Sequence, residues 1–97
     1  MTVTIAWWDL TDSGATIESL EQDMRDSIAA WCEVEGLRVK LWIVDRERNR
    51  WGAVLWWATD SPADRPLPPN RAAELIGRPP THRTQFDVVA TARGKYS

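Results

Sequence analysis

The chain has 97 residues and a formal net charge of −2, with 43% hydrophobic and 27% charged residues, which is typical of one globular domain spanning residues 1–97 with a modest core. No apolar run approaches the roughly 20 residues that a membrane span needs, and the N-terminal residues lack the pattern of a signal peptide, so we expect a cytoplasmic protein with no membrane partner. The single cysteine, Cys32, excludes an intrachain disulfide and a cysteine-rich metal site, and we expect neither a metal nor a cofactor.

The first third of the chain predicts a strand followed by a helix. Residues 2–8 alternate β-branched with small or aromatic side chains, the pattern of a strand. From about Thr16, apolar side chains recur at steps of three and four, which is the spacing of one helical face. Thr16 is placed to cap this helix, and Gly36 follows its C-terminus, where a left-handed residue is often required. The apolar face consists of Ile17, Leu20, Met24, Ile28 and Trp31.

The middle of the chain predicts a hairpin of two strands. Residues 37–44 alternate strictly, and residues 51–58 are apolar except for Gly52, which is typical of a central strand. The charged segment 45–50 joins them. The register stays open, because a shift of one residue exchanges the faces of Trp56 and Trp57. One face of the first strand is apolar, with Leu37, Val39, Leu41 and Ile43, and the other carries Arg38, Lys40, Trp42 and Val44.

The last third predicts a short helix and a fourth strand. All six prolines fall between residues 62 and 80, so a proline-rich connection over 60–69 leads to a helix capped by Asn70 and ended by Gly77. His82 and Arg83 are expected in a loop, residues 84–91 in a strand and residues 93–97 in a frayed tail. The order βαββαβ predicts an α+β, ferredoxin-like fold, a four-stranded antiparallel sheet with two helices on one face.

Seven tryptophans, four of them in the adjacent pairs 7–8 and 56–57, predict a large aromatic surface or interior. A buried tryptophan removes roughly 150–250 Å² from water but needs a partner for its indole N–H, so it suits ligand pockets and subunit interfaces. We expect Trp42 and some tryptophans of the third strand on the sheet face without helices. Such an apolar patch is too large for a monomer, which predicts a homodimer.

A few positions resemble a known family. Glu35-Gly36-Leu37, Lys40-Leu41-Trp42, Gly52 and Phe86-Asp87-Val88 resemble the small bacterial monooxygenase-like proteins of the dimeric α+β barrel superfamily, in particular the YdhR type. The resemblance implies two sheets paired into a barrel and a ligand between sheet and helices. It further implies a cofactor-independent monooxygenase acting on an aromatic or polyketide-type small molecule, or a cyclase. The proline-rich connection departs from the family pattern, in which a longer helix is expected.

Cofactor-free oxygenation needs proton removal, hydrogen bonds to the resulting anion and exclusion of water. His82 is the first candidate for proton transfer, because histidine titrates near neutrality, and Asp87 is a second possible base. The candidates for substrate binding are Lys40, Trp42, Trp56, Asn70 and Arg83. Each also has an ordinary structural explanation: strand tryptophans pack, Asn70 caps a helix and charged residues protect an edge strand.

Two alternatives stay open. A non-catalytic dimer that binds a small molecule would share the same fold, because fold does not fix function. An RNA-recognition-like module has the same element order, but there Gly52 and Val54 occupy the third-strand positions at which stacking rings are needed. A net acidic chain also lacks the positive surface that nucleic-acid binding requires, so no nucleic-acid partner is expected.

Overall fold

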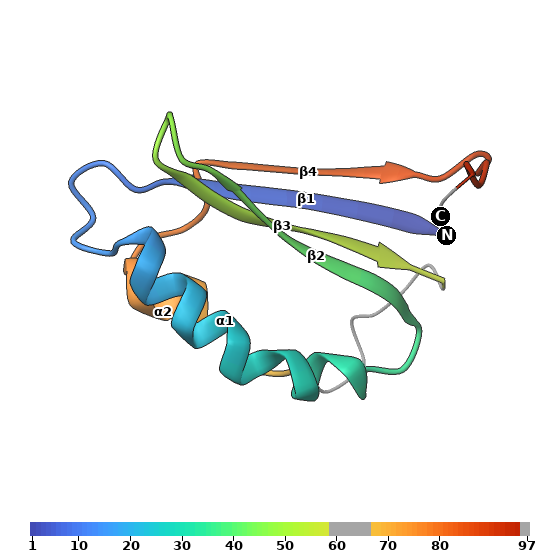
Figure 1. Cartoon of the computed structure of the whole chain (residues 1–97). Coiled ribbons are helices and arrows are strands. Elements are labelled where there is room, and N and C mark those ends of the chain that lie inside the picture. The colour runs from blue at the N-terminus through green and yellow to red at the C-terminus, as the bar shows by residue number, and fades with distance from the viewer. Residues whose placement is uncertain (59–66, 96–97) are drawn as a thin grey trace.

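The computed structural model describes residues 1–58 and 67–95, and within them the six elements follow the predicted order. Figure 1 shows both helices on one side of a single sheet, with the other sheet face bare. The sheet is antiparallel with strand order β2-β3-β1-β4, which is the ferredoxin-like arrangement. The elements are β1 Thr2–Asp9, α1 Ile17–Cys32, β2 Leu37–Asp45, β3 Arg50–Trp57, α2 Arg71–Ile76 and β4 His82–Asp87.

Both helices begin where the sequence predicts, and α2 also ends there. The expectation that Gly36 directly follows the first helix is wrong, because α1 ends at Cys32 with Glu33 as its C-cap, and the left-handed Gly36 lies in the turn before β2. Thr16 accepts a hydrogen bond from the backbone N–H of Ser19, whose side chain in turn accepts from the N–H of Thr16, forming a capping box. Asn70 accepts from the N–H of Ala73 at 3.2 Å, and Gly77 ends α2 in the left-handed conformation. With six residues, α2 is as short as predicted. Residues 60–66 of the predicted 60–69 connection and residues 96–97 of the predicted tail lie outside the described residues.

The pairing of strands settles which side chains share a face. Trp57 lies opposite Thr2, and Trp51 lies opposite Trp8, so these side chains face the helices. Trp56 lies between Val3 and Val39 on the bare face, which we call the open face. Its apolar residues come from all four strands: Val3, Ile5, Trp7, Val39, Leu41, Ile43, Val54, Trp56 and Phe86.

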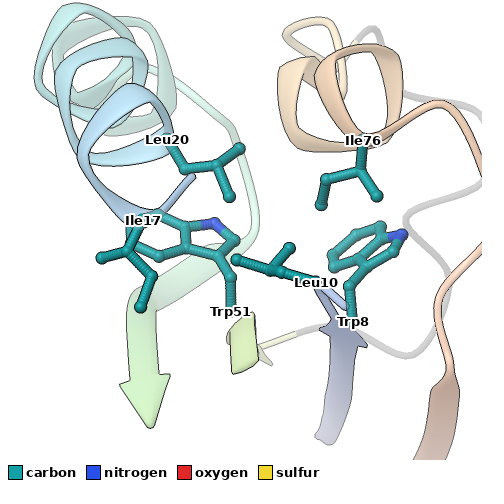
Figure 2. Close-up of a cluster of buried hydrophobic side chains, with 6 residues drawn as sticks. All are labelled: Trp8, Leu10, Ile17, Leu20, Trp51 and Ile76. Carbon is teal, nitrogen blue, oxygen red and sulfur yellow. The ribbon is translucent and has the colours of Figure 1, made fainter. Parts of the chain in front are cut away.

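The helix-side core lies at the end of the sheet where α1 begins and α2 ends. Figure 2 shows Trp8 and Trp51 side by side beneath the helices, with Leu10 between them. The residues of this cluster are Trp8, Leu10, Ile17, Leu20, Trp51 and Ile76, each at most 8% exposed. Burying one such side chain stabilises the fold by roughly 1.5–3 kcal/mol. The loop before β4 is fastened to the same end, because the Trp8 indole N–H donates to the carbonyl oxygen of Arg78 at 2.9 Å.

The fourth strand begins two residues earlier than predicted and ends at Asp87, four residues before the predicted end at residue 91. His82 and Arg83 pair with Trp7 and Ala6 of β1, so the prediction of a loop at these two residues is wrong. The physical reason is the anchor next to them: Thr81 accepts a hydrogen bond from the backbone N–H of Asp9, and the Arg78 guanidinium donates to the carbonyl of Thr11. These bonds hold the chain beside β1 directly after the two prolines, so pairing starts at once.

Candidate functional site

The interface between sheet and helices is filled at one end and hollow in the middle. Thr4, Ala6 and Ala53 face the helices from the two central strands, where a packed core would carry larger side chains. The small side chains leave a cavity of about 330 Å³ between the sheet, α1 and the segment leading into α2. This volume falls at the lower end of the range found for small-molecule sites.

Tryptophan rings form most of the apolar wall of this cavity. Trp8 and Trp57 come from the two central strands, Trp42 from the edge strand β2 and Trp31 from the last turn of α1. Trp8, Trp31 and Trp57 are buried at 4%, 9% and 3% exposure, so their positions are fixed by packing. Flat, rigid rings on several sides favour a flat apolar ligand, since stacked and edge-to-face aromatic contacts add about 0.5–1.5 kcal/mol each.

The positively charged ammonium group of Lys40 lies against two of these tryptophan rings. Its Nζ atom lies 3.5 Å from the ring centroid of Trp31 and 4.6 Å from that of Trp42. Burial lowers the pKa of Lys40 from its ordinary 10.5 to about 8. Within residues 1–58 and 67–95, no hydrogen bond or ion pair involves this ammonium group. As far as the described residues go, its three N–H donors are available to a ligand.

The remaining polar groups of the cavity are few and carry no negative charge. Thr4, Asn70, Arg83 and Gln85 line it, and no carboxylate is found among its described lining residues. The side-chain oxygen of Asn70 is used in capping α2, which leaves its NH₂ group as a donor. Arg83 lies on β4 and Lys40 on β2, the two edge strands of the sheet. The cavity is consequently apolar with positive charge at both ends.

Four of the residues proposed from sequence meet at this cavity: Lys40, Trp42, Asn70 and Arg83. The expectation that Trp42 lies on the face without helices is wrong, because Trp42 pairs with Ala53 and faces α1. Lys40 and Trp42, expected on one face of this strand, do share a face and form a cation–π contact. Arg38 does not join them, because a register shift between Leu37 and Val39 interrupts the alternation, and its guanidinium lies 4.4 Å from the Trp56 ring centroid.

The other three proposed residues lie elsewhere. Trp56 is on the open face, and its indole N–H is buried with no hydrogen-bond partner among the residues that the structure describes. His82 also lies on the open face, where its ring stacks on Trp7 with 5.7 Å between centroids. Asp87 lies at the end of β4, opposite Thr2, exposed and outside the cavity lining. The structure therefore does not bring His82 and Asp87 to the cavity.

Trp8, Trp31 and Trp57 are site residues that the sequence analysis did not single out. Trp31 was visible as the last residue of the helix's apolar face, and its place at the C-terminal end of α1 sets it above β2. Trp57 and Trp8 became assignable only when the sheet register was known, because both belong to adjacent tryptophan pairs whose members point to opposite faces.

A second, shallower hollow of about 200 Å³ lies on the open face. Trp7, Ile43 and Arg50 surround it, and Gly52 forms its floor. The Arg50 guanidinium lies 4.4 Å from the Trp7 ring centroid, on a ring that also stacks with His82. This hollow is open to one side and is lined by two tryptophans, Trp7 and Trp51, whereas four line the cavity under the helices, which is therefore the better ligand site.

No family model and no curated protein matches the sequence significantly. In the described residues, neither helix is long and apolar enough to cross a membrane. No group of three or more histidine, cysteine or acidic side chains in the same residues has a spacing suited to a metal ion. What the protein does is accordingly argued from the cavity itself.

Proposed function

We propose that the protein binds a flat aromatic or polyketide-type small molecule in the cavity under the helices and acts on it as a cofactor-independent, monooxygenase-like enzyme. The observation that carries the proposal is the set of four tryptophan rings around a preformed hollow of about 330 Å³, with a half-buried lysine against two of them. An ordinary core of this size would fill that space with aliphatic side chains.

Lys40 is the group that would start the reaction. A pKa of about 8 leaves part of its population neutral near pH 7–8, so it can accept a proton from an acidic ring carbon of the substrate. The deprotonated carbon adds O₂ to give a hydroperoxide, which eliminates water and leaves a carbonyl. The substrate supplies all four electrons, one oxygen atom enters the product and the other leaves as water. Asn70 and Arg83 would hold polar groups of the substrate, and the tryptophan walls would exclude bulk water.

The second candidate function is binding without turnover. It is favoured by one observation: the described lining of the cavity holds no histidine and no carboxylate, so Lys40 stands there without a partner for proton relay. A carrier or a cyclase-like protein would need the same walls and the same cation, but no oxygen chemistry.

Anthrone is a suitable probe, because its CH₂ group is acidic and its oxygenation product, anthraquinone, is easily detected. We expect anthrone to quench tryptophan fluorescence on binding and to be oxidised with uptake of one O₂ per molecule. Lys40→Met should lower kcat/KM by at least about 100-fold, the usual contribution of a general base, while binding persists. Arg38→Met, which removes a cation on the same strand but on the Trp56 ring, is the matched control and should leave turnover unchanged.

O₂ uptake, measured with an oxygen electrode, distinguishes the two candidate functions. Binding without O₂ uptake above the uncatalysed rate identifies the non-catalytic function, and absence of binding contradicts both.

The same proposal includes a homodimer in the cytoplasm. Its support is the open face, on which Leu41 and Phe86 are 51% and 57% exposed, a large apolar patch for a monomer. The exposed thiol of Cys32 suits a reducing compartment.

A further inference from the structure

We infer that the ligand of the cavity is an aromatic acid, bound as an anion whose charged oxygen contacts the Lys40 ammonium. The inference rests on the binding part of the proposed function, since it names the chemical class of the molecule that occupies the same cavity. An ammonium group paired with the ligand's anion is not also the base, so for such a ligand the inference favours binding without turnover. It goes beyond that proposal, because an aromatic ligand needs no charge to fit between tryptophan rings.

The first argument is the charge around the cavity. Lys40 and Arg83 are the only charged residues of its described lining, and neither forms an ion pair with a carboxylate within residues 1–58 and 67–95. Four arginines of the described residues are paired with carboxylates, for example Arg46 with Glu21 at 2.6 Å, whereas others lie on tryptophan rings as Lys40 does. A half-buried cation that has no anion partner in the described part of the chain is a site at which a ligand can supply one.

The second argument is the geometry at Lys40. Two ring faces hold the ammonium at 3.5 and 4.6 Å from their centroids, and both rings belong to the cavity wall. Ring faces attract a cation but accept none of its hydrogen bonds as an oxygen would. A flat acid lying against Trp42 would bring its oxygen to the free N–H donors, and the low polarity of the walls would strengthen that ion pair.

The charged and titratable groups near Lys40 come from several elements, and they set the electrostatic surroundings of a bound anion. On α1, Asp23 is held by Arg71 of α2, and Cys32 lines an adjoining hollow with Arg38 of β2. Arg83 of β4 is three strand spacings away, or about 14 Å between backbones. At that distance the charge of Arg83 is largely screened. Lys40 therefore forms the ion pair with the ligand's anion, and Arg83 only makes the electrostatic potential in the cavity slightly more positive.

The test compares naphthoate with naphthamide, two flat ligands of nearly the same shape that differ in charge, by calorimetric titration. At about pH 7 we expect the wild-type protein to bind naphthoate about 10- to 100-fold more tightly than naphthamide, the value of one charge-assisted hydrogen bond. Lys40→Met should abolish this preference and leave naphthamide binding as it was. Arg83→Met should reduce it only slightly, and the control Arg38→Met should retain it.

Proton dependence gives a second readout. Naphthoate stays ionised above about pH 5, whereas Lys40 loses its proton as the pH rises through about 8. The preference should therefore shrink in the wild type at about pH 9.5 and persist in Lys40→Arg, whose guanidinium stays charged.

Equal affinity of the wild type for the two ligands would overturn the inference and leave aromatic binding intact. A preference that survives Lys40→Met would overturn it as well. Failure of both ligands to bind would overturn the inference together with the proposed function.

Discussion

Lys40 is the residue at which folding and function oppose each other. Two effects act on its ammonium: loss of hydration lowers the pKa to about 8, while the ring faces of Trp31 and Trp42 attract the charge by about 0.5–2 kcal/mol. A buried cation without an anion lowers the stability of the empty protein. A residue retained at such a cost is a candidate for ligand contact rather than for packing.

The cost has a pH dependence with a definite sign. The folded pKa lies below the unfolded value of 10.5, so between about pH 8 and 10.5 the unfolded chain binds more protons at Lys40, and rising pH stabilises the fold through this residue. We expect Lys40→Met to raise the free energy of unfolding at about pH 7 by roughly 1–2 kcal/mol, a figure reduced for the exposed part of the side chain and for the ring contacts. The gain should vanish by about pH 10.5.

Urea denaturation of both proteins across this range measures the difference. Arg38→Met is the control. Arginine side chains stay charged throughout this pH range, so the difference in the free energy of unfolding between Arg38→Met and wild type should not vary with pH. A gain for Lys40→Met that stays constant from pH 7 to about 10.5 would show that burial does not perturb the lysine.

The elements of the fold were predictable from local patterns, whereas the side of the sheet each strand residue faces was not. Thr16, Asn70 and Gly77 act through their nearest neighbours, so helix ends could be read from sequence. The register depends on pairs such as Trp7 with Gly52, distant in the chain. The more apolar face of β2 is the bare one, which reverses the usual reading of an alternating strand, and that is why Trp42 was placed on the wrong side.

The candidate site shows the same division. Residue type and strand position pointed to Lys40, Trp42, Asn70 and Arg83, and the fold gathers them at one cavity. His82 was selected by residue type, because histidine is the usual proton-transfer group in proteins, and residue type carries no information about position. Its pairing with Trp7 sends the ring to the open face, away from the cavity.

Gly52 fixes the register of the central strands. A Cβ atom there would contact the carbonyl oxygen of Ala6 and would lie 2.7 Å from the Trp7 Cβ atom, closer than real Cβ atoms approach. We expect Gly52→Ala to lower the free energy of unfolding by about 1–3 kcal/mol, because β1 or β3 must shift to relieve the overlap. The measurement is the urea midpoint, with Gly94→Ala as control, since a Cβ there meets no atom within 4 Å. Equal midpoints for Gly52→Ala and wild type would mean that the strands are not this close.

At the scale of the whole molecule, the two sheet faces differ in how they are covered. The helix side is hollow and can be filled by a ligand, whereas the open face is apolar and has nothing over it in the described residues (Figure 1). Its middle row joins Leu41, Val54, Ile5 and Thr84 across all four strands. Two such flat faces can pack against each other at the usual distance of about 10 Å between sheets.

The proposed homodimer predicts that charge on this face, and only on this face, dissociates the protein. Leu41 and Phe86 are exposed in the single chain, so Leu41→Lys and Phe86→Lys should leave the fold intact. In a two-fold interface each substitution occurs twice and buries two unpaired ammonium groups, so we expect the dissociation constant of the dimer to rise by at least about 100-fold. Leu75→Lys on α2 is the control, because that leucine is similarly exposed, at 41%, but belongs to the helix layer.

Sedimentation over a concentration series distinguishes the outcomes, against a chain mass of 11.1 kDa. Wild type and Leu75→Lys should sediment at twice this mass at concentrations where Leu41→Lys and Phe86→Lys sediment as single chains. Ligand binding should survive in the single chains, because every described wall of the cavity comes from one copy. A wild-type protein that sediments as one chain at all concentrations would contradict the dimer. It would not contradict the ligand site, which lies on the opposite face of the sheet and is tested separately by the ligand titrations.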